Sequence, residues 1–139
     1  MILILGGTTE GRLAVKVADE AGSPYYYSTR GIQQEIACRN GIHLTGGMDV
    51  EAMTSFCIHY QIRLLVDAAH PFAVGLHQTV HETAIRLNLP VVRVERSYPE
   101  RATDIVWCED YEDAVRQLEK DRIHSLLSLT GVQTIGKLR

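Results

Sequence analysis

The chain begins with an apolar run that passes directly into a glycine-rich turn. Residues 1–5 read Met-Ile-Leu-Ile-Leu, and the turn at 6–11 reads Gly-Gly-Thr-Thr-Glu-Gly. A strand without polar alternation is typical of a parallel sheet that is covered on both faces. Apolar residues then recur at helical spacing as far as Gly22, a residue suited to a helix C-terminus. The helical face expected to be buried consists of Leu13, Ala14, Val17, Ala18 and Ala21.

A strand, a glycine turn and a helix N-terminus together favour a phosphate site, because backbone N–H groups and the helix dipole point at the anion. The spacing from Gly6 to Gly11 matches the first and last glycines of the dinucleotide pattern G-x-G-x-x-G, but Thr8 stands at the middle position. An ordinary tight turn, with polar residues that only cap the helix, is the alternative. The candidate cofactor-binding residues here are Gly6, Gly7, Thr8, Thr9 and Glu10.

The second predicted strand, residues 24–28, indicates which cofactor the turn would serve. It leads into Ser28, Thr29 and Arg30, and no Asp or Glu lies between Ser23 and Gln34. An acidic residue at this corner binds the ribose hydroxyls of NAD, whereas an arginine accepts the 2′-phosphate of NADP. Together with the glycine turn, Ser28, Thr29 and Arg30 predict NADPH. The alternative is a solvated arginine in a loop.

Strands and helices alternate along the rest of the chain. Further strands are predicted at 43–45, 63–67, 90–95, 105–107 and 125–129, and a helical turn within 31–40. Helices are predicted after Asp49 and Asp110, which suit N-caps, and along the apolar face of Leu76, Val80, Ala84 and Leu87. This order predicts a doubly wound, Rossmann-like parallel α/β sheet.

Ligands of such sheets bind beyond the carboxyl ends of the strands. The chemically informative residues follow those ends, at 6–10, 28–30, 46–47, 67–72 and 93–96. Gly46 and Gly47 join the candidate cofactor residues on this ground. His70, held before a proline, is a candidate proton donor, or else a loop cap. Arg93 and Arg96 suit an anionic substrate, or else a surface ion-pair network.

Composition excludes several other classes of function. The net charge of −3 and the scattered Lys and Arg residues give no basis for nucleic-acid binding. No apolar stretch approaches the roughly 20 residues of a membrane helix. Three widely spaced cysteines indicate reduced thiols, so a cytoplasmic location is expected. His77 and His81 lie four apart without the Glu of H-E-x-x-H, so an exposed polar helix face is favoured over a metal site, and no metal is expected.

Four motifs in order resemble the precorrin-6A reductase family of cobalamin biosynthesis. They read I-L-I-L-G-G-T-T-E-G-R at the start, T-G-G after the third strand, V-D-A-A-H-P-F-A in the middle and P-V-V-R-V-E-R thereafter. Ala69 stands where the family's middle motif usually has threonine. The resemblance spans residues 1 to about 96.

The resemblance implies an enzyme that uses NADPH to reduce one double bond of precorrin-6A or its cobalt form. It implies that a tetrapyrrole rich in carboxylates faces Asp67, His70, Pro71, Phe72, Arg93 and Arg96, with His70 as the candidate catalytic residue. It also implies two Rossmann-like halves, so residues 1–124 are expected to form the first and 125–139 to begin the second, which makes the chain a fragment. The alternatives are a nucleotide-binding module that senses a ligand without chemistry, and an NADP-dependent reductase of another small substrate.

Overall fold

The computed structural model describes residues 1–31, 36–97, 100, 102–129 and 136–137. The chain divides into two compact units, Met1–Ser97 and Tyr98–Arg139. The predicted helical turn within 31–40 lies partly outside the described residues. The predicted boundary after residue 124 stays a prediction.

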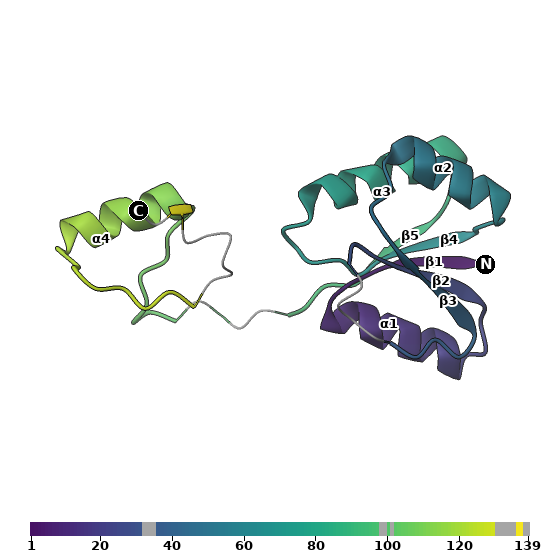
Figure 1. Cartoon of the computed structure of the whole chain (residues 1–139), viewed down its shortest axis with the longest axis horizontal. Helices are drawn as coiled ribbons and strands as arrows, with labels where there is room; N and C mark the ends of the chain where they lie inside the picture. The colour runs from purple at the N-terminus through teal and green to yellow at the C-terminus, as the bar shows by residue number, and fades with distance from the viewer. Residues whose placement is uncertain (32–35, 98–99, 101, 130–135, 138–139) are drawn as a thin grey trace. The chain divides into compact units, whose positions relative to one another are not determined.

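The first unit is a five-stranded parallel sheet with the strand order β3-β2-β1-β4-β5. Its strands are β1 (Ile2–Leu5), β2 (Tyr25–Thr29), β3 (Gly41–Thr45), β4 (Leu64–Asp67) and β5 (Val91–Arg93). Its helices are α1 (Thr9–Glu20), α2 (Val50–His59) and α3 (Val74–Leu87). Helix α1 covers one face of the sheet, while α2 and α3 cover the other (Figure 1). The predicted doubly wound parallel fold is confirmed.

The central strand β1 is buried on both faces, as its unbroken apolar run predicts. Leu3 and Leu5 pack in the core beneath α2 and α3, with Met53 of α2 among their neighbours. Ile4 packs in the core beneath α1, together with Val15. Because these side chains are buried on both faces, water is excluded from the hydrogen bonds that join β1 to β2 and β4, and β1 forms the centre of the unit.

The buried face of α1 differs from the predicted one. Ala18 is buried and Ala14 packs against the core as predicted. Leu13 and Val17 are instead 54% and 64% exposed, and Gly11 and Val15 are buried in their place. A Cβ on Gly11 would lie 2.9 Å from the Gly6 Cα, so the helix starts in close contact with the end of β1. That contact fixes the rotation of α1 about its axis, which the apolar spacing alone placed wrongly.

The helix caps agree with the sequence. Asp49 Oδ1 accepts the Ala52 N–H at 2.8 Å and so caps α2. Gly22 follows α1 with a φ of +63°, the left-handed conformation expected at a helix end.

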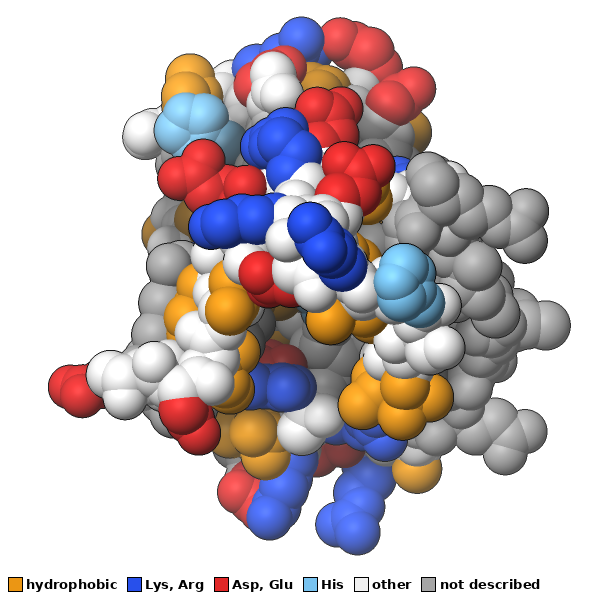
Figure 2. Space-filling view, turned by 90° about the vertical axis from the view of Figure 1, so that its left-hand side faces the viewer, with side chains coloured by type: hydrophobic (Ala, Val, Ile, Leu, Met, Phe, Trp, Pro, Cys, Tyr) orange, Lys and Arg blue, Asp and Glu red, His pale blue; other side chains and the backbone are white. Residues whose placement is uncertain are grey.

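The second unit contains the helix α4 (Tyr111–Lys120), which Asp110 caps as predicted. Within the described part of this unit no strand forms, so the strands predicted at 105–107 and 125–129 are wrong. These short apolar runs have no neighbouring strand among the described residues to complete a ladder. On the face seen in Figure 2, acidic and basic side chains are interspersed with apolar ones. No described helix is long and apolar enough to cross a membrane.

Candidate functional site

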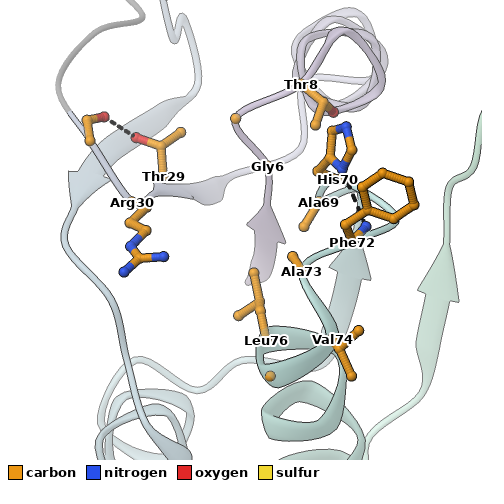
Figure 3. A pocket seen from close by; sticks show the side chains of 13 residues that line it. Gly6, Thr8, Thr29, Arg30, Ala69, His70, Phe72, Ala73, Val74 and Leu76 are labelled. Atoms are coloured by element: carbon orange, nitrogen blue, oxygen red, sulfur yellow. Dashed lines mark hydrogen bonds between the residues drawn. The ribbon is translucent and has the colours of Figure 1, made fainter. Parts of the chain in front are cut away.

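The carboxyl edge of the sheet carries a pocket of about 550 Å³. Three loops form its walls, namely residues 6–8 after β1, 29–31 at the end of β2, and 69–76 from the β4 loop into α3. This is the point where the connections leave β1 toward one face and β4 toward the other. Figure 3 shows Arg30 on one side of the pocket and His70 with Phe72 on the other. Ligands of open parallel sheets bind at this topological switch point.

The glycine turn is held from beneath by a tyrosine of β2. The Gly7 N–H donates to the Tyr27 hydroxyl at 2.9 Å, and Gly7 has a φ of +103° that side-chain-bearing residues rarely adopt. A Cβ on Gly6 would collide with the Tyr27 ring. Burial raises the pKa of Tyr27, so the phenol stays protonated. The glycines thus permit a close approach of the turn to β2.

Thr8 joins the turn to the neighbouring loop after β4. Its hydroxyl accepts the Gly11 N–H at 3.1 Å as the cap of α1, and donates to the Ala68 carbonyl at 2.7 Å. Thr8 stands at the position of the middle glycine of G-x-G-x-x-G. Its hydroxyl therefore joins the turn after β1 to the loop after β4 by a hydrogen bond. Its predicted contact with a cofactor stays a prediction.

Arg96 forms an ion pair, the alternative that the sequence left open for it, but its partner Glu10 was not predicted. Arg96 Nε and Nη2 donate to the two Glu10 carboxylate oxygens at 2.9 and 3.3 Å. The Arg96 guanidinium lowers the pKa of Glu10 from its ordinary 4.5 to about 2. The pair ties the segment after β5 to the first turn of α1. The structure brings together one predicted cofactor residue and one predicted substrate residue, and both roles stay predictions.

The corner after β2 combines two buried hydroxyls with an exposed arginine. Ser28 and Thr29 are buried, and Thr29 Oγ1 donates to the Gly31 carbonyl at 2.9 Å. His43 Nε2 lies 2.8 Å from the same oxygen, and because the single hydroxyl proton is already used, we assign this ring nitrogen as the donor. Arg30 lines the pocket, and no acidic side chain in the described residues pairs with it. A cation that no described carboxylate neutralises therefore lies at the end of β2.

A second pocket of about 500 Å³ adjoins the first. The two pockets share Thr29, Arg30, Gly75 and Leu76. The turn after β3 forms another wall of the second pocket with Gly46 and Gly47, and Gly46 has a φ of +113°. One continuous depression along the sheet edge is thus lined by most of the predicted cofactor residues, namely Gly6, Gly7, Thr8, Ser28, Thr29, Arg30, Gly46 and Gly47. Thr9 and Glu10, also predicted, line neither pocket.

The last residue of β4, Asp67, is a buried carboxylate that is paired and hydrogen-bonded within the protein. Asp67 is 4% exposed and pairs with Arg93 at 2.7 Å and with His77 Nδ1 at 2.8 Å. It also accepts the Ala69 N–H at 3.3 Å. His77 Nε2 lies 3.0 Å from the His70 carbonyl, so this network holds the loop that carries His70. Arg93 bonds in addition to Glu95 at 2.9 Å.

His77 is the residue of this network that the sequence interpretation missed. An exposed polar helix face was expected for it, but its side chain is only 24% exposed. Its place in the first turn of α3, directly after the His-Pro loop, was the available signal. His81 is exposed, and among the described residues no group of three potential ligands could hold a metal ion.

His70 and Phe72 lie at the mouth of the first pocket. The Phe72 N–H donates to His70 Nδ1 at 3.2 Å, so the neutral imidazole carries its proton on Nε2. The Phe72 ring is 87% exposed and lies 5.1 Å from the His70 ring, between centroids. Pro71 is half-buried between them. An aromatic face beside an N–H donor suits a flat, polar ligand.

Comparisons with known proteins identify one family. The family described as "Precorrin-6x reductase CbiJ/CobK" matches residues 1–139. A cobalt-precorrin-6A reductase of Methanocaldococcus jannaschii is 27% identical over 96% of this chain and 55% of its own length. A cobalt-precorrin-6A reductase of Priestia megaterium is 26% identical over 97% and 54%. A precorrin-6A reductase of Rhodococcus erythropolis is 33% identical over 68% and 39%.

Two solved structures share the fold. The chain titled "CobK precorrin-6A reductase" superposes with a TM-score of 0.70 at 22% identity, over 83% of this chain and 47% of that one. A leucoanthocyanidin reductase–NADPH complex from Vitis vinifera superposes with a TM-score of 0.56 at 12% identity, over 88% and 44%. The chain spans about half the length of the curated cobalt-precorrin-6A reductases it matches over nearly its whole length.

Proposed function

The chain belongs to the precorrin-6x reductase family, and on that premise we propose that it binds NADPH and takes part in the reduction of precorrin-6A or cobalt-precorrin-6A. NADPH supplies a hydride to one carbon of a substrate double bond, a proton reaches the neighbouring carbon, and NADP⁺ is released. The observation that carries the proposal is the continuous depression at the carboxyl edge, with a glycine turn at one point and Arg30 at another.

The cofactor assignment rests on Arg30 and on the turn. Arg30 lines both pockets and has no acidic partner among the described residues, so it is available to the 2′-phosphate that distinguishes NADPH from NADH. The glycine turn and the start of α1 suit the diphosphate. The second pocket, beside Gly46 and Gly47, suits the adenosine portion. The leucoanthocyanidin reductase that shares this fold is in complex with NADPH, which supports this choice.

The substrate assignment rests on the mouth of the first pocket. The exposed Phe72 ring offers a flat apolar surface for a conjugated macrocycle, and His70 Nε2–H offers a proton or a hydrogen bond to it. Asp67 and Arg93 support this wall from beneath through His77. We assign Arg96 to a substrate carboxylate, which would replace Glu10 as the partner of the guanidinium.

The greater length of the relatives supports a two-part substrate site. Because two of them are matched over 55% and 54% of their length, we propose that a second Rossmann-like half completes the site.

The experiment is an anaerobic assay of NADPH absorbance with the protein that includes the proposed second half, and either precorrin-6A or cobalt-precorrin-6A. Consumption of NADPH that depends on one tetrapyrrole supports the reductase, and substitution of His70→Ala is expected to lower that rate. NADPH binding without consumption with either substrate would favour a nucleotide-binding module instead. Absence of NADPH binding would refute both.

A further inference from the structure

Three consecutive tyrosines of β2 have three different surroundings. Tyr25 donates from its hydroxyl to Asp19 at 3.0 Å, near the C-terminal end of α1. Tyr26 points to the opposite face, where its ring packs on Phe56 at 5.0 Å between centroids. Tyr27 reaches the glycine turn and accepts the Gly7 N–H at 2.9 Å. Of Tyr26 and Tyr27, only Tyr27 bonds to the turn. Comparing variants of these two neighbours therefore measures what the Tyr27 hydroxyl contributes to the turn.

The turn is built around the Tyr27 side chain, which has no exposed surface. A Cβ on Gly6 would collide with its ring, and a Cβ on Gly11 would lie 2.9 Å from its hydroxyl oxygen. Two of the turn's glycines thus make room for a phenol beneath the backbone. The third, Gly7, has a φ of +103° and donates its N–H to that phenol.

The opposite side of the turn is held by Thr8. Its hydroxyl bonds both to the Gly11 N–H and to the Ala68 carbonyl. The turn is consequently fixed from below by one hydroxyl and from the side by another, although it lacks the fingerprint's middle glycine. A turn fixed before its ligand arrives loses less conformational entropy on binding.

We propose that Tyr27 is a positioning residue for the nucleotide diphosphate. By bonding to the Gly7 N–H it sets the backbone of the turn, so that the segment entering α1 faces the phosphates in the bound geometry. The proposal rests on the proposed function, since it takes the pocket to be an NADPH site. It assigns Tyr27 no contact with the ligand.

The test compares Tyr27→Phe with the matched variant Tyr26→Phe in the 139-residue chain. Each change removes one phenol oxygen from a buried ring of the same strand, on opposite faces of the sheet. Tyr27→Phe removes the bond that holds the Gly7 N–H, and a net contribution of the size of one hydrogen bond corresponds to about a tenfold change in affinity. Calorimetry with NADPH is expected to show about that loss for Tyr27→Phe and no loss for Tyr26→Phe. Equal affinities in the two variants would overturn the proposal.

Two further measurements separate positioning from a general loss of structure. 2′-AMP carries the phosphate that faces Arg30 but no diphosphate, so its inhibition of NADPH binding is expected to be unchanged by Tyr27→Phe. A parallel loss for 2′-AMP would show damage to the whole site and overturn the proposal. Hydrogen exchange at the Gly7 amide of the unaltered chain is expected to be slow, and fast exchange there would also overturn it.

The failure of this proposal is distinguishable from that of the proposed function. If the unaltered chain binds NADPH and Tyr27→Phe binds it equally well, the positioning role fails and the cofactor assignment stands. If the unaltered chain does not bind NADPH, the cofactor assignment itself fails, and the positioning role fails with it.

Discussion

Asp67 and Arg93 are direct partners across the β4–β5 ladder, and their side chains meet at 2.7 Å. They are the last residues of their strands, and Asp67 is buried. The pair closes the carboxyl end of the sheet beneath the loop that carries His70. A buried carboxylate needs a counter-charge, because its desolvation is otherwise uncompensated.

Asp67→Asn is therefore expected to lower the free energy of unfolding by about 3 kcal/mol, since it leaves Arg93 and His77 without their anionic partner. Glu95→Gln is the matched control, because Glu95 bonds to the same arginine from an exposed position. Its loss is expected to be below about 1 kcal/mol. Urea denaturation followed by circular dichroism measures both, and similar losses would show that burial of the pair contributes little.

Arg30→Ala is expected to weaken NADPH binding by about tenfold or more, because a charge-assisted hydrogen bond contributes about 1.5–3 kcal/mol. NADH lacks the 2′-phosphate, so its affinity is expected to change little. Arg63→Ala is the control, since Arg63 is exposed and directly precedes β4, at the amino end of the strands and away from the pockets. Calorimetry on both cofactors makes the comparison. A loss shared equally by NADPH and NADH would contradict the assignment of the 2′-phosphate.

Thr8→Ala removes both the cap of α1 and the bond to the Ala68 carbonyl. The expected loss is about 2 kcal/mol in the free energy of unfolding, from about 1 for the cap and about 1 for the bond. Thr9→Ala alters the exposed neighbour and is expected to stay within about 0.5 kcal/mol of the unaltered chain. Thermal and urea unfolding of the two variants test this. A Thr8 variant as stable as the Thr9 variant would show that these two bonds do not stabilise the fold.

The Glu10–Arg96 pair predicts a specific acid titration. Glu10 has a lowered pKa of about 2, so the pair stabilises the fold above the ordinary carboxyl pKa of 4.5 and loses this contribution as the pH falls toward 2. NMR of the carboxyl carbon is expected to show Glu10 still ionised at about pH 3.5, where an ordinary glutamate is mostly protonated. Arg96→Ala is expected to return the pKa toward 4.5. An ordinary titration in the unaltered chain would show that the pair does not persist in solution.

The sequence predicted those parts of the fold that depend on local pattern. The unbroken apolar run of β1 predicted burial on both faces, and Asp49 and Asp110 predicted the starts of two helices. The rotation of α1 was missed because it depends on the contact between Gly11 and Gly6. The strands predicted at 105–107 and 125–129 were wrong because an apolar run cannot by itself supply a ladder partner.

The sequence predicted which loops form the candidate site, but not the hydrogen bonds that hold those loops in place. Parallel strands bring their carboxyl ends to one edge, which placed Arg30 and His70 around the same pocket. The contacts of Tyr27 with Gly7 and of His77 with Asp67 join residues 20 and 10 positions apart. No spacing rule encodes such contacts, because they arise from strand register and helix rotation together.

The central claim is that the carboxyl edge of this sheet binds NADPH, and NMR titration of the isotopically labelled chain tests it most directly. Addition of NADPH is expected to shift the amides of three segments: residues 6–8, 29–31 and 46–47. The amide of Arg63, at the opposite edge, is expected to stay in place. No shift in the three segments at millimolar NADPH, or shifts confined to other parts of the chain, would contradict the account.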